Sequence, residues 1–264
     1  MKTPLQFRLV YGTINTMGVL CGAPNEGESV IMKKYTYLLF DVDNTLLDFD
    51  RSEHDAMADA LVEHGFAADD EIIAKYSLIN DAHWEMLEKG EMDRETLVWH
   101  RFKVLGETCG LSPMDPVAFA ESYVKHLTHK SFLMDGALEV CQELAKHYTL
   151  IAITNGNASV QHGRFDPSPL FPLFKDAFIS EDIGHNKPAQ AYFDAVAAAL
   201  PDLDPAHALV IGDSLSSDMA GGVRWGCDTC WLCPDEQNRG AAQARGLNLT
   251  YTISHLRELL DILL

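Results

Sequence analysis

The stretch Tyr37-Leu-Leu-Phe-Asp-Val-Asp-Asn-Thr45 decides the fold of this chain. Four largely apolar residues run straight into polar ones, which is typical of a parallel β-strand that is buried on both faces and ends at a ligand crevice. Similar apolar runs recur at 150–153, 177–179, 208–211, 229–232 and 251–253, with helical patterns between them at about 136–147, 157–165, 188–200, 215–225 and 254–263. This alternation predicts an α/β fold whose core is a doubly wound, Rossmann-like parallel sheet.

One long interval of the chain breaks this alternation. Residues 51–132 contain no convincing strand, and their apolar residues recur at helical spacing. We therefore expect an inserted α-helical cap at 51–132 and a catalytic core formed by 34–50 and 133–264. Residues 1–33 are expected to be a poorly ordered N-terminal extension, because Met32 stands just before the first strong strand.

The composition excludes several classes of protein. The chain has 264 residues, of which 47% are hydrophobic and 22% charged, as in ordinary globular proteins and unlike collagen, coiled coils or disordered chains. Its 20 basic and 39 acidic residues give a formal net charge of −19, which repels nucleic acid and anionic membrane surfaces. No apolar run approaches the length that crosses a bilayer. We expect a cytoplasmic protein that binds neither nucleic acid nor membranes.

The six cysteines are too few and too scattered for a disulfide scaffold in a chain of this length. Three of them, Cys227, Cys230 and Cys233, have a spacing that also occurs in metal sites. They lie on an expected strand, where a spacing of three places successive side chains on opposite faces, so their sulfurs should not converge. We interpret them as small buried hydrophobic residues in a reducing compartment.

Four polar clusters follow the expected strands, at the edge of the sheet where open α/β folds bind their ligands. In chain order they are Asp41 with Asp43, Thr154-Asn155-Gly156, Lys187-Pro188, and Gly212-Asp213-Ser214 with Asp218 in the next helix. Each cluster alone has a common structural explanation, as a helix cap, a turn or a helix start. All four together, in order and each after a strand, indicate a site.

The residue types in these clusters favour phosphate chemistry. Asp41 and Asp43 lie two residues apart, so both carboxylates can face one crevice, where one can attack an electrophile while the other moves protons. Asp213 and Asp218 add negative charge, which favours a hard cation such as Mg²⁺ among the carboxylates. Lys187 and the backbone N–H groups at the Thr-Asn-Gly turn supply positive potential for an anion such as phosphate.

In combination, these motifs resemble those of the haloacid dehalogenase-like (HAD) hydrolases. The resemblance covers the chain from Tyr35 to its end and includes the position of the helical cap. Asp43 resembles the residue found in phosphate-processing members, since the dehalogenases lack a carboxylate there and a halide leaving group needs no proton. Within the family, the segments 40–49, 179–184 and 229–232 most resemble noncanonical pyrimidine 5′-nucleotidases.

The resemblance implies a role for each motif. Asp41 would be the nucleophile that forms an aspartyl-phosphate, and Asp43 would protonate the leaving oxygen and then activate water. Thr154 and the backbone of Asn155 would hold the phosphate oxygens, and Lys187 would neutralise charge on the nucleophile and the phosphoryl group. Phosphoryl transfer of this kind depends mainly on positioning and charge neutralisation.

The resemblance also implies Mg²⁺ as the cofactor. The ion would be bound by the Asp41 side chain, the Asp43 backbone carbonyl and Asp213, with Asp218 as a supporting residue. One segment departs from the family pattern, because Arg164–Pro172 is richer in proline than the family leads us to expect.

The resemblance implies the Mg²⁺-dependent hydrolysis of a phosphomonoester, with a nucleotide as the expected substrate, by a monomer or homodimer. Two alternatives stay open: a phosphatase or phosphomutase for another small metabolite such as a sugar phosphate, and a catalytically silent binding protein. The core motifs contact groups common to every phosphomonoester, so discrimination should come from the cap. The mixed aromatic and polar residues there are His83, Trp84, Trp99, Arg101 and Phe102. Most should pack the cap, and an aromatic such as Trp84 or Phe102 should approach the leaving group.

Overall fold

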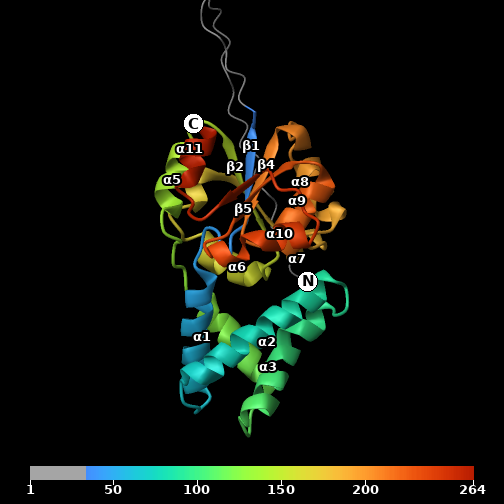
Figure 1. The fold of residues 1–264 in the computed structure, drawn as a ribbon. Helices are drawn as coiled ribbons and strands as arrows, with labels where there is room; N and C mark the ends of the chain where they lie inside the picture. The colour runs from blue at the N-terminus through green and yellow to red at the C-terminus, as the bar shows by residue number, and fades with distance from the viewer. Residues whose placement is uncertain (1–33) are drawn as a thin grey trace, which may run out of the picture. The chain divides into compact units, whose positions relative to one another are not determined.

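The computed structural model describes residues 34–264; the expected N-terminal extension and Cys21 lie outside the described residues. Six strands form one parallel sheet in the order β3-β2-β1-β4-β5-β6 (Figure 1). The strands are β1 Tyr37–Phe40, β2 Thr149–Thr154, β3 Phe174–Ile179, β4 Ala208–Gly212, β5 Asp228–Leu232 and β6 Tyr251–Ile253. Each corresponds to an apolar run in the sequence, and the predicted doubly wound α/β fold is confirmed.

The strand order reverses between β1 and β4. The chain adds β2 and β3 on one side of β1, then crosses to the other side and continues outward from β4. Ligands of open α/β sheets bind beyond the carboxyl ends of the strands at such a reversal. Asp41 follows β1 at this point, and its backbone N–H donates to the carbonyl of Ile211 in β4 over 2.8 Å.

Each face of the sheet is covered by its own hydrophobic cluster, because successive side chains of a strand point to opposite faces. Leu38 and Phe40 belong to one cluster, and Tyr37 and Leu39 to the other. Helices α5 Ala137–Leu144, α6 Ala158–Phe165 and α11 Glu258–Leu263 pack into the first cluster. Helices α7 Ser180–Ile183, α8 Gln190–Ala199, α9 Ala220–Trp225 and α10 Ala241–Ala244 pack into the second.

The three clustered cysteines lie on opposite faces of the sheet. Cys230 packs in the first hydrophobic cluster, whereas Cys227 and Cys233 pack in the second. Their sulfurs therefore do not converge, as their spacing predicted. Within residues 34–264, the group of side chains that converges as metal ligands would contains no cysteine.

Four helices stand between β1 and α5, and we call them the helical insert (Figure 1). They are α1 Phe49–Glu63, α2 Asp70–Glu88, α3 Arg94–Cys109 and α4 Pro116–Leu127. Each begins after an aspartate whose side chain accepts a hydrogen bond from a first-turn N–H, as helix caps do. Their apolar faces meet around Tyr76, Phe102 and Phe119. Along residues 34–264, every helix is too short or too polar to cross a membrane.

Candidate active site

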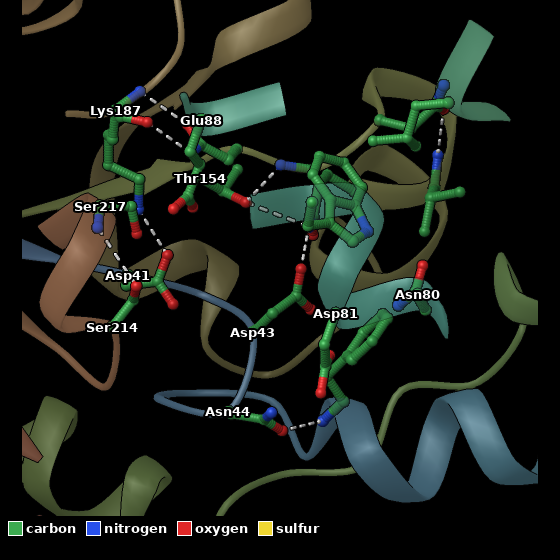
Figure 2. Close-up of a pocket in the computed structure, with 18 of the residues that line it drawn as sticks. Asp41, Asp43, Asn44, Asn80, Asp81, Glu88, Thr154, Lys187, Ser214 and Ser217 are labelled. Carbon is green, nitrogen blue, oxygen red and sulfur yellow. Dashed lines mark hydrogen bonds and ion pairs between the residues drawn. The ribbon is translucent and has the colours of Figure 1, made fainter. Parts of the chain in front are cut away.

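The four polar clusters meet in one pocket beyond the carboxyl ends of β1, β2 and β4. Its volume is about 240 Å³, and side chains of the helical insert complete its lining (Figure 2). The residues singled out by the sequence that line it are Asp41, Asp43, Thr154, Asn155, Lys187, Asp213 and Asp218. The fold thus brings together residues from four separate loops.

Lys187 lies at the buried end of this pocket, where its side chain is 1% exposed. Its Nζ donates to Oδ1 of Asp41 and to Oδ1 of Asp218, each over 2.6 Å, and to the carbonyl of Ile153 over 3.0 Å. Burial acts to lower the pKa of Lys187, but Asp218 and Asp41 together outweigh it and hold the pKa above its ordinary value. The amine is therefore a fixed cation against the Asp41 carboxylate.

Asp41, Asp213 and Asp218 form a carboxylate cluster in which one oxygen of each lies within 4.8 Å of the others. Burial, followed by the charge of Asp218, raises the pKa of Asp41 well above its ordinary value and that of Asp213 to about 7. Three carboxylates share one ammonium here, so the ionised cluster has excess negative charge. A hard divalent cation fits this donor set, and Mg²⁺ is characteristically bound through one or two carboxylates.

The orientation of Asp218 is fixed by contacts with both of its carboxylate oxygens. Oδ1 accepts from Lys187, and Oδ2 accepts from the backbone N–H of Ser214 over 3.1 Å. Gly212 leaves the space for this carboxylate, since a Cβ at that position would lie 2.3 Å from Oδ2 of Asp218. Because both oxygens of Asp218 already accept hydrogen bonds from the protein, this side chain is placed to orient its neighbours.

The loop after β2 is tied to the loop that carries Lys187. The Asn155 side chain donates to the backbone carbonyl of Lys187 and accepts from its backbone N–H, each over 2.8 Å. The hydroxyl of Thr154 accepts from the N–H of Gly156 over 3.0 Å. The two Asn155 bonds set the two loops at a fixed separation, and the Thr154 bond orders the loop after β2, which suits the binding of one small anion there.

Asp43 follows Asp41 by two residues in the loop after β1 and faces the same pocket (Figure 2). Its Oδ1 accepts from a terminal nitrogen of Arg164 over 2.5 Å, and its Oδ2 accepts from the amide of Gln161 over 2.6 Å. The same Gln161 amide donates to the hydroxyl of Thr154 over 3.2 Å. Residues of α6 therefore link Asp43 to the loop after β2.

The helical insert contacts the core beside the pocket through Arg94. One terminal nitrogen of this arginine donates to the carbonyl of Asn155 over 3.0 Å, to the hydroxyl of Ser180 over 2.8 Å and to the side-chain oxygen of Asn186 over 2.7 Å. Its guanidinium carbon also lies 5.4 Å from the ring centre of Trp84. This contact links the insert to the loop that carries Asn155.

Of the two cap aromatics expected near the leaving group, Trp84 lines the pocket. Phe102 instead packs inside the insert, fully buried, with its ring centre 5.3 Å from that of Tyr76. Helical spacing identifies an apolar face but not the neighbour against which that face packs.

Sequence reasoning missed three polar contacts of the site, those of Gln161, Arg164 and Arg94. Gln161 and Arg164 are three residues apart and so share one face of α6. Arg164 also opens the segment that departs from the family pattern. Polar residues at helical spacing directly after the Thr-Asn-Gly turn were the signal that could have revealed the first two.

Comparison with known proteins identifies the family of the chain. The family model described as haloacid dehalogenase-like hydrolase matches residues 35–226. The HAD-hydrolase YfnB of Bacillus subtilis is 37% identical over 232 residues, which cover 88% of this chain and 97% of YfnB. A crystal structure of YfnB bound to magnesium has a TM-score of 0.82 to this chain and covers 88% of it and 99% of YfnB.

Two further relatives carry the name pyrimidine 5′-nucleotidase. PynA of Streptococcus pneumoniae is 34% identical over 231 residues, covering 87% of this chain and 95% of PynA. YjjG of Escherichia coli is 26% identical over 230 residues, covering 87% of this chain and 98% of YjjG. The resemblance predicted from the motifs is confirmed, and the chain is an enzyme that belongs to the haloacid dehalogenase-like hydrolases.

Proposed function

We propose that this enzyme is a Mg²⁺-dependent phosphomonoester hydrolase that acts through an aspartyl-phosphate on nucleoside monophosphates. The observation that carries the proposal is the buried contact of 2.6 Å between Asp41 and Lys187, in a pocket that also contains Asp43. A carboxylate beside a fixed cation, with a second carboxylate facing the same space, suits phosphoryl transfer to a carboxylate.

In the first step, a carboxylate oxygen of Asp41 forms a bond to phosphorus while the bond between phosphorus and the ester oxygen breaks. Asp43, in its acid form, gives its proton to that ester oxygen, and the alcohol leaves. Lys187 balances the charge on the nucleophile and the phosphoryl group. Thr154 and the backbone N–H of Asn155 hold the phosphoryl oxygens in line for attack.

In the second step, Asp43 takes a proton from water as the water oxygen attacks phosphorus. The bond between phosphorus and Asp41 breaks, inorganic phosphate leaves, and both carboxyl groups return to their starting states. One carboxyl group thus serves as acid and then as base, so the reaction needs no other proton carrier.

The carboxylate cluster would hold the metal ion. Asp41, Asp213 and the backbone carbonyl of Asp43 would be the ligands, with Asp218 in support. Bound Mg²⁺ supplies positive charge that compensates the carboxylates and the phosphoryl oxygens. Without it, the excess negative charge of the cluster opposes the approach of a phosphate.

One observation favours a nucleotide among the possible phosphomonoesters. PynA and YjjG are named as pyrimidine 5′-nucleotidases, and both match nearly their whole length. A pocket of about 240 Å³ is small for a ligand site and suits one compact metabolite. A sugar phosphate would fit the same core residues. The choice between a nucleotide and a sugar phosphate therefore depends on the residues of the helical insert that line the pocket.

We further propose the division of the chain that the sequence predicted. Residues 34–50 and 133–264 form the catalytic core, and residues 51–132 form the cap that selects the leaving group. The hydrogen bonds of Arg94 in the insert to the core loops support this assignment. The free, mostly buried cysteines among residues 34–264 support a reducing compartment such as the cytoplasm.

A panel of phosphorylated metabolites tests the proposal. Nucleoside monophosphates, sugar phosphates and p-nitrophenyl phosphate are compared for released phosphate, with Mg²⁺ or with EDTA. We expect hydrolysis that requires Mg²⁺, with a higher kcat/KM for nucleotides than for sugar phosphates. A preference for sugar phosphates would favour the alternative substrate class, and the absence of phosphate release from every compound would contradict the proposal.

A further inference from the structure

Arg94 of the helical insert lines the pocket, and the proposed chemistry gives it no part. One of its terminal nitrogens donates to the carbonyl of Asn155 over 3.0 Å, to the hydroxyl of Ser180 over 2.8 Å and to the side-chain oxygen of Asn186 over 2.7 Å. Asn155 follows β2, Ser180 begins α7, and Asn186 directly precedes Lys187. A single guanidinium group from the insert therefore joins three segments of the core around the pocket.

The bond to Asn155 acts on a peptide group beside the expected phosphate site. The carbonyl of Asn155 and the N–H of Gly156 belong to the same planar peptide unit. That N–H donates to the hydroxyl of Thr154 over 3.0 Å. Because hydrogen bonds in a chain polarise one another, a cation at the carbonyl end of this peptide strengthens the donor at its N–H end.

The two bonds that the Thr154 hydroxyl accepts direct its proton outward. A hydroxyl group has two lone pairs and one proton. One lone pair of Thr154 accepts from the N–H of Gly156, and the other accepts from the amide of Gln161 over 3.2 Å. The proton is then what this hydroxyl can offer to a further partner. Thr154 lines the pocket and is 2% exposed, so a phosphoryl oxygen that enters the pocket suits this donor.

The insert holds the guanidinium of Arg94 in place. Its carbon lies 5.4 Å from the ring centre of Trp84, a distance at which an aromatic ring attracts a cation. Arg94 is the first residue of α3, and the Asp93 cap before it accepts from the N–H of Thr96 over 2.7 Å. Burial lowers the pKa of Arg94 and the charge of Glu181 acts against burial. Arginine stays protonated in proteins, so the group is a fixed cation.

We propose that Arg94 is a positioning residue for the phosphate site, which orients and polarises the Thr154 hydroxyl through the peptide group between Asn155 and Gly156. This inference rests on the proposed function and deepens it, because it gives a residue of the helical insert a role in phosphate binding. Since Arg94 belongs to the insert, the phosphate site is complete only while the insert contacts the core. The phosphoryl group is common to all phosphomonoesters, so the contribution of Arg94 is independent of the leaving group.

The test measures the binding of inorganic phosphate and the hydrolysis of phosphomonoesters by the full chain with Mg²⁺. In Arg94→Ala, the dissociation constant of inorganic phosphate, from calorimetric titration, should rise about tenfold. The value of kcat/KM should fall by a similar or larger factor. This fall should be the same for a nucleotide, a sugar phosphate and p-nitrophenyl phosphate.

Chemical rescue tests the guanidinium group itself. Added guanidinium ion, far below the concentrations that unfold proteins, should restore part of the phosphate binding and of the kcat/KM of Arg94→Ala. The same addition should leave the wild type unchanged. If Arg94→Ala fails to fold, Arg94→Met takes its place, because it keeps an apolar stem of similar length against Trp84.

Two control variants separate this role from that of a simple clamp. Ser180→Ala removes another bond of Arg94 and spares its bond to Asn155, so phosphate binding should stay close to the wild-type value. Lys103→Ala removes a cation from the same helix, where Lys103 pairs with Glu107 at the surface over 3.9 Å. This second control should change neither phosphate binding nor the melting temperature.

The outcomes separate this inference from the proposed function. Unchanged phosphate binding in Arg94→Ala, in an enzyme that hydrolyses phosphomonoesters, overturns the inference and leaves the proposed function standing. An equal loss of phosphate binding in Ser180→Ala, or a loss of kcat/KM confined to one class of substrate, also overturns the inference. A wild type that binds phosphate through Arg94 and hydrolyses no phosphomonoester contradicts the proposed function alone, and one that does not bind phosphate overturns both.

Discussion

Arg164 donates a hydrogen bond of 2.5 Å to the carboxylate of Asp43, and its side chain is fully buried. The same guanidinium donates to the carbonyl of Lys130 over 2.9 Å and to the hydroxyl of Ser52 over 3.3 Å. Ser52 lies in the first turn of α1, and Lys130 follows α4, so Arg164 contacts both ends of the helical insert. The carboxyl group proposed to move protons is therefore held by a residue that also joins the insert to the core.

The first prediction concerns Arg164→Lys, which keeps the charge but cannot form the same set of hydrogen bonds. We expect kcat to fall about tenfold or more while KM changes little, because Asp43 is no longer held in one orientation. The melting temperature should fall as well, since the buried guanidinium bonds are lost. Arg257→Lys is the matched control, because that arginine pairs with Asp135 at the surface, and it should change neither value. A wild-type kcat in Arg164→Lys would show that Arg164 does not position Asp43.

The second prediction concerns Asp41→Asn, which keeps the shape of the side chain and removes the attacking charge. We expect kcat to fall by about three orders of magnitude or more. The free energy of unfolding should stay the same or rise, because burial and Asp218 raise the pKa of Asp41 and so disfavour its charge. Released phosphate and the melting temperature are measured on the same preparation. Near-normal turnover would contradict the proposed nucleophile.

The local parts of the site were predictable from the sequence, and the long-range parts were not. Asp41, Asp43 and Asp213 directly follow apolar runs, and the topology of a parallel sheet brings such positions to one edge. The Arg164–Asp43 contact joins residues 121 apart in the chain. A buried arginine on a helix looks like a solvated one in a single sequence, because its burial depends on which element packs over it.

In the helical insert, too, the sequence predicted the local structure but not the long-range contacts. The periodicity of α2 and α3 predicted helices, and both are present. Their angle and register are set by side-chain packing, so the sequence could not show that Asn80 meets both Glu53 and Arg101. Arg101 was expected mainly to pack the cap, and its place at the pocket follows only from the tertiary structure.

The third prediction concerns the pH dependence of stability in Glu53→Gln. Burial raises the pKa of Glu53 from 4.5 to about 7, so the folded state binds the proton more tightly than the unfolded state between those values. Ionising Glu53 therefore lowers the free energy of unfolding of the wild type as pH rises through this window, by about 3 kcal/mol in total. The glutamine side chain does not ionise, so the variant lacks this contribution.

Urea unfolding of both proteins from pH 4.5 to 8 measures the difference. We expect the variant to gain stability relative to the wild type across the window and to keep that gain above it. A constant difference between the two proteins at every pH would show that Glu53 titrates normally in the folded enzyme. All other titrating groups are common to both proteins, so their contributions cancel in the difference between the two free energies of unfolding.

The last prediction concerns Gly212→Ala, which tests whether the position of Asp218 controls the metal site. The added Cβ would lie 2.3 Å from Oδ2 and 2.5 Å from Cγ of Asp218, so this carboxylate must move away from Lys187 and from the backbone of Ser214. Asp213 and Asp41 then lose a neighbour that orders them, and we expect the Mg²⁺ concentration for half-maximal activity to rise about tenfold or more. Gly240→Ala is the matched control, because a Cβ there meets no atom within 4 Å, and it should leave the Mg²⁺ titration unchanged. If Gly212→Ala retains the wild-type Mg²⁺ dependence, Asp218 does not support the metal ligands, and its proposed role is wrong.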